Sequence, residues 1–332
     1  TDPFNGNFDT ELQNTLDTEI GDQGYDLGHL FDFGEPNGDA GCVGCVCISG
    51  LKGKGFSTHP FTDIFGGEYR NDYFDLDYAG HEIGHQFGAY HTFAYDTEGT
   101  GVNAEPGSGS TIMGYAGITG EDDLQQHGDP YFHYLSIREI SSLLEVKNCQ
   151  NAEENSNISP LVNAGINTYI PIGTAYQLTA LATETDSSSL TFTWEQLDDG
   201  RVNNSNFSSN LISGSLNRSY PPSLSPIRYV PNLTRILEGN LTQSNPSINS
   251  QWESLSTIGR TINWGVTVRD KIIGNGNYVG QIAQDQIKIN VVEDSKPFKL
   301  TSQNSSTELW GSGSIEKITW DVGNTFESPI NT

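Results

Sequence analysis

The chain has 332 residues and a net charge of −26, from 16 basic and 42 acidic side chains. Such acidity repels nucleic-acid phosphate and anionic membrane surfaces, and the chain has no basic stripe and no apolar run near the about 18–20 residues of a membrane span. Nucleic-acid partners and a membrane span are therefore excluded, and the length predicts two or three domains of roughly 100–200 residues each.

Charge and reactive side chains are unevenly distributed along the chain. Residues 1–150 carry a net charge of −20 (5 basic and 25 acidic side chains), whereas residues 151–332 carry −6 (11 and 17). All seven His, all four Cys and the only Met, Met113, lie within residues 1–149. Any site that needs nitrogen or sulfur ligands is therefore expected in the first part, and the second part can be scaffold.

In chain order, the first part is predicted to mix strands and helices. Residues 25–31 (YDLGHLF) are expected to form a strand, and residues 41–49 (GCVGCVCIS) a strand of small residues. The second strand is either an exposed edge that pairs with an extended peptide substrate or a buried strand in which cysteines need room. Residues 75–87 are expected to form a helix that ends at Gly88.

The predicted helix carries a pattern of metal ligands. His81 and His85 lie four residues apart, hence on one helical face, where both can bind one metal ion. Gly88 can adopt the left-handed conformation that ends a helix, so the chain can turn sharply and return His91 to the same ion. Three neutral imidazoles with an open fourth position are typical of catalytic zinc.

A zinc ion held in this way predicts hydrolytic chemistry. Zinc lowers the pKa of a bound water toward about 7. Glu82, beside the first ligand, is then the general base that takes the proton of this water and later passes it to the leaving amine. The spacing of these four residues therefore indicates metal-assisted hydrolysis of a peptide bond.

The full pattern resembles a known superfamily of peptidases. H-E-x-x-H-x-x-G-x-x-H, followed 22 residues later by Met113 in the tight turn TIMGY, resembles the metzincin metallopeptidases. Residues 85–93 (HQFGAYHTF) and residues 105–117 (EPGSGSTIMGYAG) look like the reprolysin-like group of secreted bacterial proteins. The resemblance implies that Met113 forms a hydrophobic floor beneath the three imidazoles and does not ligate the metal.

Two features depart from that family. Thr92 follows the third His where animal reprolysins place Asp, as in the pappalysin-like metzincins, so the subfamily is left open. Only 80 residues precede His81, and they start close to the strand of residues 25–31, so part of the N-terminal subdomain is expected to be absent from this chain. This truncation predicts a chain that is unstable or poorly active although its zinc ligands are intact.

Tyr115 has two interpretations. It lies two residues after Met113, where astacin-like and serralysin-like metzincins carry a tyrosine that contacts zinc or stabilises the oxyanion of the transition state. The alternative is a core tyrosine inside the turn.

The four cysteines also allow two interpretations. Cys42 and Cys45 have a spacing found in zinc sites, and four Cys allow three disulfide pairings. The resemblance implies a Cys47–Cys149 disulfide, which leaves Cys42–Cys45 as a local bridge. Two disulfides are favoured over a second metal and agree with an oxidising exterior.

The other histidines are not expected to bind metal. His29 lies in an apolar strand and is predicted to be structural, and no ligand role is assigned to His59. His127 and His133 follow the methionine turn, in a segment expected to wall the first primed substrate pocket. Residues 136–139 (SIRE) form a capping box that predicts the start of a helix.

The second part is predicted to be an all-β region. Residues 151–159 are polar and aperiodic, hence a linker, and residues 294–332 are expected to begin a further β domain that is truncated. Residues 160–293 are predicted to form an immunoglobulin-like sandwich of antiparallel strands without helices, with an irregular insertion at about 200–255. The clearest alternating strands are residues 176–181, 190–194, 261–268 and 287–292.

Acidic side chains near the predicted strand ends of this sandwich could bind Ca²⁺, although an ordinary solvated loop is the favoured interpretation. These side chains are Glu184, Asp186, Asp198, Asp199 and Asp270.

Together, the sequence predicts a multidomain protein with an α/β (α+β) metzincin-type catalytic domain at residues 1–150 and an accessory or adhesive β-sandwich. The expected function is that of a secreted zinc metalloendopeptidase that acts on protein or peptide substrates. The alternative is a secreted adhesion or binding protein with a vestigial metallopeptidase domain. Glu82 favours the enzyme, because pseudo-proteases usually lose that residue. The oligomeric state is left open.

Overall fold

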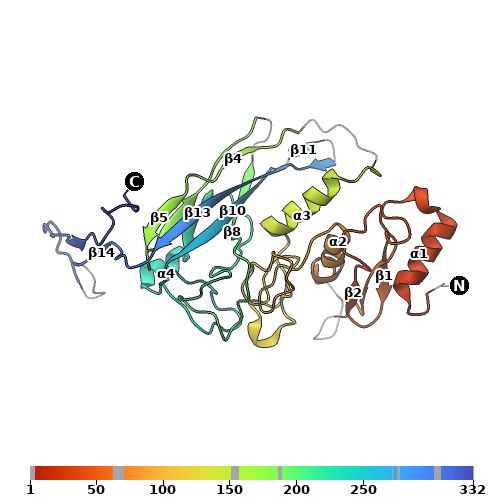
Figure 1. Cartoon of the computed structure of the whole chain (residues 1–332), viewed down its shortest axis with the longest axis horizontal. Coiled ribbons are helices and arrows are strands. Elements are labelled where there is room, and N and C mark those ends of the chain that lie inside the picture. Colours follow the sequence, from red (N-terminus) through yellow and green to blue (C-terminus); the bar gives the residue numbers. More distant parts are fainter. Residues whose placement is uncertain are drawn as a thin grey trace.

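The computed structural model describes residues 4–62, 71–150, 157–185, 189–270, 272–274, 277–302 and 308–331. Figure 1 shows an elongated molecule with the N-terminal region at one end, a four-stranded sheet toward the other, and helix α3 (Tyr134–Glu145) between them. Among the helices of the described ranges, none is both long enough and apolar enough to span a bilayer.

A three-stranded sheet underlies the N-terminal region. β3 (Gly55–His59) is the central strand, pairing in parallel with β1 (His29–Phe33) and antiparallel with β2 (Asn37–Asp39). Helix α1 (Phe8–Glu19) packs on the sheet and is followed by the 3-10 turn η1 (Asp22–Gly24). Since β3 is central, β1 and β2 are the two edge strands of this sheet within the residues that the structure describes.

The two strands predicted before residue 50 need correction. The strand predicted at residues 25–31 begins only at His29. Residues 41–49 form no strand, because Gly41, Gly44 and Cys47 all have positive φ angles (70°, 75° and 66°) that an extended strand does not contain. This segment is a series of turns instead.

The helix predicted at residues 75–87 is confirmed. It consists of the π-helical segment η2 (Phe74–Gly80) and the α-helix α2 (His81–Gln86). Gly88 follows with a φ of 98°, and a Cβ atom at this position would lie 2.9 Å from Leu143 Cδ2. Glycine is therefore required here both by the left-handed turn and by the close approach of α3.

The chain between α2 and α3 has little regular structure apart from the 3-10 turn η3 (Gly120–Asp122). The predicted capping box at residues 136–139 is wrong, because α3 begins at Tyr134. His133 caps this helix, and its Nδ1 accepts a hydrogen bond from the second backbone N–H of the helix (3.2 Å). Glu139, the expected capping acid, instead accepts a hydrogen bond from the backbone N–H of Tyr90 (3.0 Å).

The C-terminal region is built on a mixed four-stranded sheet of order β5-β13-β10-β8. β10 (Arg260–Asp270) pairs antiparallel with both β13 (Ile282–Val292) and β8 (Leu190–Gln196), whereas β5 (Thr168–Pro171) pairs in parallel with β13. The smaller elements are β4 (Leu161–Asn163), β6 (Tyr176–Thr179), β7 (Leu181–Thr183), β9 (Ile227–Val230), α4 (Leu233–Glu238), β11 (Ile272–Gly274) and β12 (Asn277–Val279).

The strands predicted in this region are confirmed in part. Those at residues 190–194, 261–268 and 287–292 lie within β8, β10 and β13. The strand predicted at residues 176–181 is divided at Ala180 into β6 and β7, which pair with β9 and β4 respectively.

The expectation of a region without helices and with antiparallel strands alone is wrong. β5 is parallel to β13, and the short helix α4 interrupts the strands. α4 forms because both of its ends are capped. The Asn232 side chain accepts a hydrogen bond from the backbone N–H of Arg235 (3.2 Å), and Gly239 ends the helix in the left-handed conformation.

The apolar core of the C-terminal region is continuous, and a second cluster joins it to the N-terminal region. The main core contains the buried side chains of β8, β10 and β13, including three that are fully inaccessible, Trp264, Val266 and Val268. The joining cluster consists of Ala94, Leu124, Val202, Phe207 and Trp252. The irregular insertion at residues 200–255 therefore packs against the N-terminal region.

Two segments lie at the predicted domain boundaries, the predicted linker at residues 151–159 and the residues after β13. In the predicted linker, residues 151–156 lie outside the described part of the chain, while Asn157 is buried and donates a hydrogen bond to Asp270 Oδ1 (3.1 Å). After β13, the two-residue strands β14 (Lys299–Leu300) and β15 (Trp320–Asp321) pair antiparallel.

Candidate metal centre

Three histidines bring their side-chain nitrogens together at the end of α2. His81 and His85 lie on this helix and His91 on the segment that follows Gly88. His91 Nε2 lies 2.9 Å from His85 Nε2 and 3.2 Å from His81 Nε2. Three nitrogens bound to one tetrahedral zinc ion at 2.0–2.1 Å would be about 3.3 Å apart. The spacing of this group therefore fits a metal ion.

The hydrogen bonds of the three Nδ1 atoms determine which nitrogen of each imidazole is bare, that is, carries no proton. His81 Nδ1 donates to the carbonyl oxygen of Ile112 (2.7 Å), and His85 Nδ1 donates to that of Ala89 (2.7 Å). A carbonyl can only accept, so in the neutral ring the proton is on Nδ1 and the lone pair is on Nε2. His91 Nδ1 faces the carboxylate of Glu98 at 2.9 and 3.0 Å, which selects the same tautomer.

Burial keeps all three rings neutral. It lowers the pKa of His81 and of His85, and burial together with the neighbouring His85 lowers the pKa of His91 to about 3. Three Nε2 lone pairs thus converge in one buried place, where they repel one another unless a cation lies between them. The donor set, neutral imidazole nitrogen, is the one that zinc binds.

Glu82 lies between the imidazoles and the edge of the N-terminal sheet. A Cβ atom on Gly38 of β2 would lie 2.5 Å from Glu82 Oε1, so the strand backbone passes directly beside the carboxylate. Burial, reinforced by the negative charge of Asp39, raises the pKa of Glu82 to about 7. A carboxylate with such a pKa can both take and return a proton near neutral pH.

The centre opens onto a cleft with two parts. One part, of about 850 Å³, reaches His81, and the other, of about 550 Å³, reaches His85 and His91. Glu82 and Tyr115 line both parts and so stand where these meet. The strand that borders the cleft is β2, because its residue Gly38 lines both parts of the cleft. Residues 41–49 are not that strand, since they contribute only loop residues, and these line only the smaller part.

Tyr115 packs against the imidazoles. The centre of its ring lies 4.5 Å from that of His91 and 5.5 Å from that of His81. Burial, with the nearby Glu82 as a further cause, raises the pKa of Tyr115 to about 12, so its hydroxyl keeps its proton and can donate a hydrogen bond at neutral pH.

Met113 lies beneath α2, fully inaccessible to solvent. A Cβ atom on Gly84, one residue before the second histidine, would lie 2.5 Å from Met113 Sδ. The turn that holds Met113 also supplies the Ile112 carbonyl that orients His81. Helix and turn are thus in direct contact at the metal centre.

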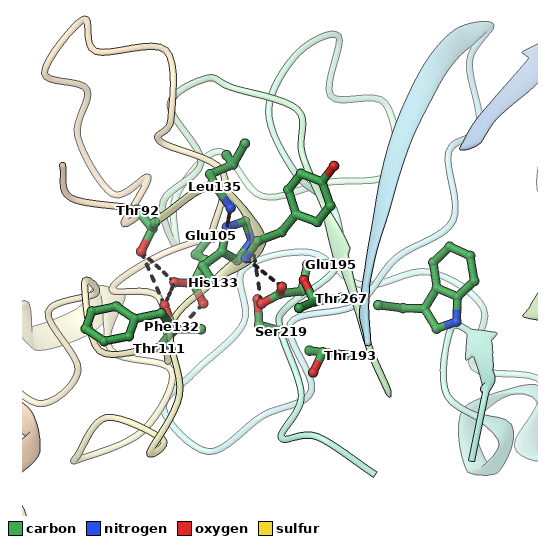
Figure 2. A network of polar contacts seen from close by, with 12 residues as sticks. Thr92, Glu105, Thr111, Phe132, His133, Leu135, Thr193, Glu195, Ser219 and Thr267 are labelled. Carbon is green, nitrogen blue, oxygen red and sulfur yellow. Dashed lines mark hydrogen bonds and ion pairs between the residues drawn. The ribbon is translucent and has the colours of Figure 1, made fainter. Parts of the chain in front are cut away.

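A buried carboxylate, Glu105, ties this turn to the segment after His91, a role that the sequence pattern did not predict. Glu105 Oε2 accepts hydrogen bonds from the hydroxyls of Thr92 (2.6 Å) and Thr111 (2.5 Å), as Figure 2 shows. Glu105 Oε1 accepts from the backbone N–H groups of Ser110 (3.1 Å) and Thr111 (3.3 Å). One feature of the sequence could have pointed to Glu105, because it is the only charged side chain between residues 99 and 120.

Comparison with known proteins agrees with this geometry. Residues 1–154 match a metallopeptidase family model. The model is described as Metallo-peptidase family M12B Reprolysin-like. The match supports a metzincin-like peptidase domain, a zinc-dependent family and a metallopeptidase function at family level. Comparison with curated proteins and with solved structures gave no match.

The other four histidines of residues 1–154 lie outside the group formed by His81, His85 and His91. His29 is held between Gln86 Oε1 (2.8 Å) and Ser57 Oγ (2.9 Å), which agrees with a structural role. His127 contacts Asp77 (2.8 Å) and, like His59, lines the larger part of the cleft. His133 is instead buried as the cap of α3, so it is not part of the cleft wall.

Both predicted disulfides are confirmed. Cys42 is bonded to Cys45, and Cys47 is bonded to Cys149 across 102 residues of sequence. All four thiols are thereby used, so the alternative of a second metal site built from Cys42 and Cys45 is wrong.

Calcium binding is not supported by the described residues. In them, the groups of three side chains that could hold a metal are the histidine group and one that contains the Cys47–Cys149 disulfide. Asp198 accepts from Asn263, and Asp199 from the backbone N–H of Asn103. Asp270 accepts from Gln281 and Asn157, the Glu184 side chain accepts from a neighbouring backbone N–H, and Asp186 lies outside the described residues.

Proposed function

We propose that this protein is a secreted zinc endopeptidase in which His81, His85 and His91 bind zinc and Glu82 is the general base. The observation that carries the proposal is the convergence of three bare Nε2 atoms in a cleft beside a buried carboxylate. A zinc ion held there supplies Lewis acidity to water and to the carbonyl of a peptide bond.

The protein's own groups perform the remaining steps. Glu82 takes a proton from the attacking water and passes it to the leaving amine, two steps for which a pKa near 7 is well matched. Tyr115 donates a hydrogen bond to the carbonyl oxygen as negative charge develops there. The free edge of β2 pairs with the extended backbone of the substrate beside Glu82.

Secretion and the division into domains belong to the same proposal. Two disulfides support an oxidising location outside the cytosol. We propose residues 1–150 as the catalytic domain, residues 160–293 as an immunoglobulin-like accessory domain and residues 294–332 as a further β segment.

Cleavage of casein by the full chain tests the proposed reaction. We expect the zinc-loaded protein to cleave casein, a chelator to abolish cleavage, and added zinc to restore it. Glu82→Gln should lower the rate about 10²–10⁴-fold while the zinc content stays the same. Glu121→Gln, an exposed acid on η3 outside the cleft, is the matched control and should cleave normally. Cleavage that survives zinc removal, or an intact zinc-loaded protein without any cleavage, would favour the adhesion protein.

The role of Tyr115 has its own test. Tyr115→Phe removes only the hydroxyl, so we expect kcat to fall about 10²–10³-fold with little change in KM and none in zinc content. Steady-state kinetics on a fluorogenic peptide measures both parameters. Normal kcat in this variant would leave Tyr115 as a core tyrosine of the turn.

A further inference from the structure

We infer that Glu98 is a positioning residue that orients the third imidazole and strengthens zinc binding, and that the C-terminal region holds Glu98 in place through Asn103 and Asp199. This inference rests on the proposed function, because it concerns the zinc ligand His91. It differs from that proposal in naming residues outside the ligand set.

His91 needs an external partner more than the other two ligands do. His81 and His85 lie on one helix, and each donates its Nδ1 proton to a backbone carbonyl at 2.7 Å. His91 lies outside that helix, and its side chain keeps 14% of its accessible surface. Its Nδ1 faces both carboxylate oxygens of Glu98, at 2.9 and 3.0 Å. Glu98 thus does for His91 what backbone carbonyls do for the other two rings.

A carboxylate in this place affects the metal as well as the ring. It fixes the tautomer that leaves Nε2 bare, and its negative charge makes that nitrogen a stronger donor. Removing such a partner from a zinc ligand in other proteins weakens metal binding about 10–100-fold.

Asn103 holds the loop that carries Glu98. The side-chain oxygen of Asn103 accepts from the backbone N–H of Glu98 (3.0 Å). Its amide nitrogen donates to the carbonyl oxygens of His91 (3.3 Å) and Phe93 (2.8 Å). One fully buried amide therefore joins the backbone of the ligand to the backbone of its carboxylate partner.

The C-terminal region holds Asn103 in turn. The backbone N–H of Asn103 donates to Asp199 Oδ1 (2.9 Å), and the N–H of Gly200 donates to the Asn103 carbonyl (3.2 Å). Asp199 follows β8 closely, so a residue of the second region reaches the third zinc ligand through two hydrogen-bonded neighbours. This contact also gives Asp199 a role other than calcium binding.

Zinc affinity of the full chain is the decisive measurement, because it does not depend on activity. We would titrate metal-free protein with zinc against a chromogenic chelator and compare Glu98→Ala, Glu98→Gln and Asp199→Ala with the wild type. Asp96→Asn is the control, since Asp96 is a nearby acid whose side chain is 63% exposed and contacts Arg201. Thermal melting of each metal-free variant reports on folding.

We expect Glu98→Ala to bind zinc about 10–100-fold more weakly than the wild type, with metal-free melting unchanged. Glu98→Gln, which retains an acceptor but no charge, should have a smaller effect, as should Asp199→Ala, while Asp96→Asn should match the wild type. Wild-type affinity in Glu98→Ala would overturn the inference and leave the proposed function intact. A wild-type protein that binds no zinc would overturn both.

Discussion

The N-terminal and C-terminal regions of this protein hold their shapes by different means. Around the metal centre, segments without regular structure are held by buried polar contacts, such as the four hydrogen bonds to Glu105, and by two disulfides. The C-terminal region instead has long paired strands, β10 and β13, over one continuous apolar core. Individual ligand positions thus depend on specific contacts, whereas the supporting sheet depends on repeated apolar burial.

The two regions nevertheless support each other. The backbone N–H of Gly107 donates to the Val202 carbonyl (2.7 Å), and the Val202 N–H donates to the Ala94 carbonyl (2.7 Å). A Cβ atom on Gly107 would lie 2.9 Å from Trp252 Cη2, so the loop that follows Glu105 is packed tightly against the insertion. We therefore expect the regions to unfold together despite their different construction.

The largest expected effect concerns the covalent ties of the N-terminal region. Replacing Cys47 and Cys149 by Ala opens a loop of 102 residues and should lower the free energy of unfolding by about 4–5 kcal/mol. Replacing Cys42 and Cys45 opens a much shorter loop and should cost about 2 kcal/mol. Urea unfolding of both double variants measures the difference. Equal losses of stability in the two double variants would show that the stabilisation by these disulfides does not depend on the length of the loop that each one closes.

A matched pair of variants separates stability from ligand positioning. Ile262→Ala creates a cavity in the C-terminal core and should cost about 2–5 kcal/mol, with zinc affinity of the folded protein unchanged. Glu105→Ala leaves backbone N–H groups of the methionine turn unpaired, should cost about 2–3 kcal/mol, and should also weaken zinc binding. Glu105→Gln keeps a hydrogen-bond acceptor, so its stability and its zinc affinity should lie between those of Glu105→Ala and the wild type.

Urea unfolding and chelator competition on the same samples give both quantities for each variant. If Ile262→Ala weakened zinc binding as much as Glu105→Ala, the contrast between the two regions would be lost.

The smallest expected effect lies at the junction of the regions and depends on pH. Glu195 of β8 is fully buried, accepts from the Tyr134 N–H (2.7 Å) and lies 3.9 Å from His133 (Figure 2). Burial raises its pKa above the usual value, assisted by the negative charge of Glu105 and opposed by the positive charge of Arg269. Its contribution to stability is therefore fully present below about pH 4 and is lost as the pH rises through the folded-state pKa.

Glu195→Gln tests this sign, because the amide stays neutral at every pH. Relative to the wild type, the variant should gain stability as the pH rises from about 4 through the folded-state pKa of Glu195, by about 1.4 kcal/mol for each unit by which the folded-state pKa exceeds the unfolded-state pKa. Calorimetric melting of both proteins over this range measures the gain. A gap that stayed constant with pH would mean that Glu195 does not change its proton affinity on folding.

Local patterns predicted the parts of the structure that are themselves local. The ligand helix, its end at Gly88 and the alternating strands within β8, β10 and β13 follow from periodicity and from the freedom of one glycine. Residues 41–49 were mispredicted because their composition suits a strand, whereas their turns and the Cys42–Cys45 bridge decide their conformation.

The sequence by itself determined that three histidines, a glutamate and a methionine turn belong to one metallopeptidase-like pattern, because those residues are related by fixed short spacings. Only the tertiary structure decided what holds them. The contact of Glu98 with His91, the hydrogen bonds to Glu105 and the Asn103–Asp199 link join loops that have no periodicity. Such loops take their shape from their partners, and the C-terminal partners lie up to about a hundred residues away in the chain.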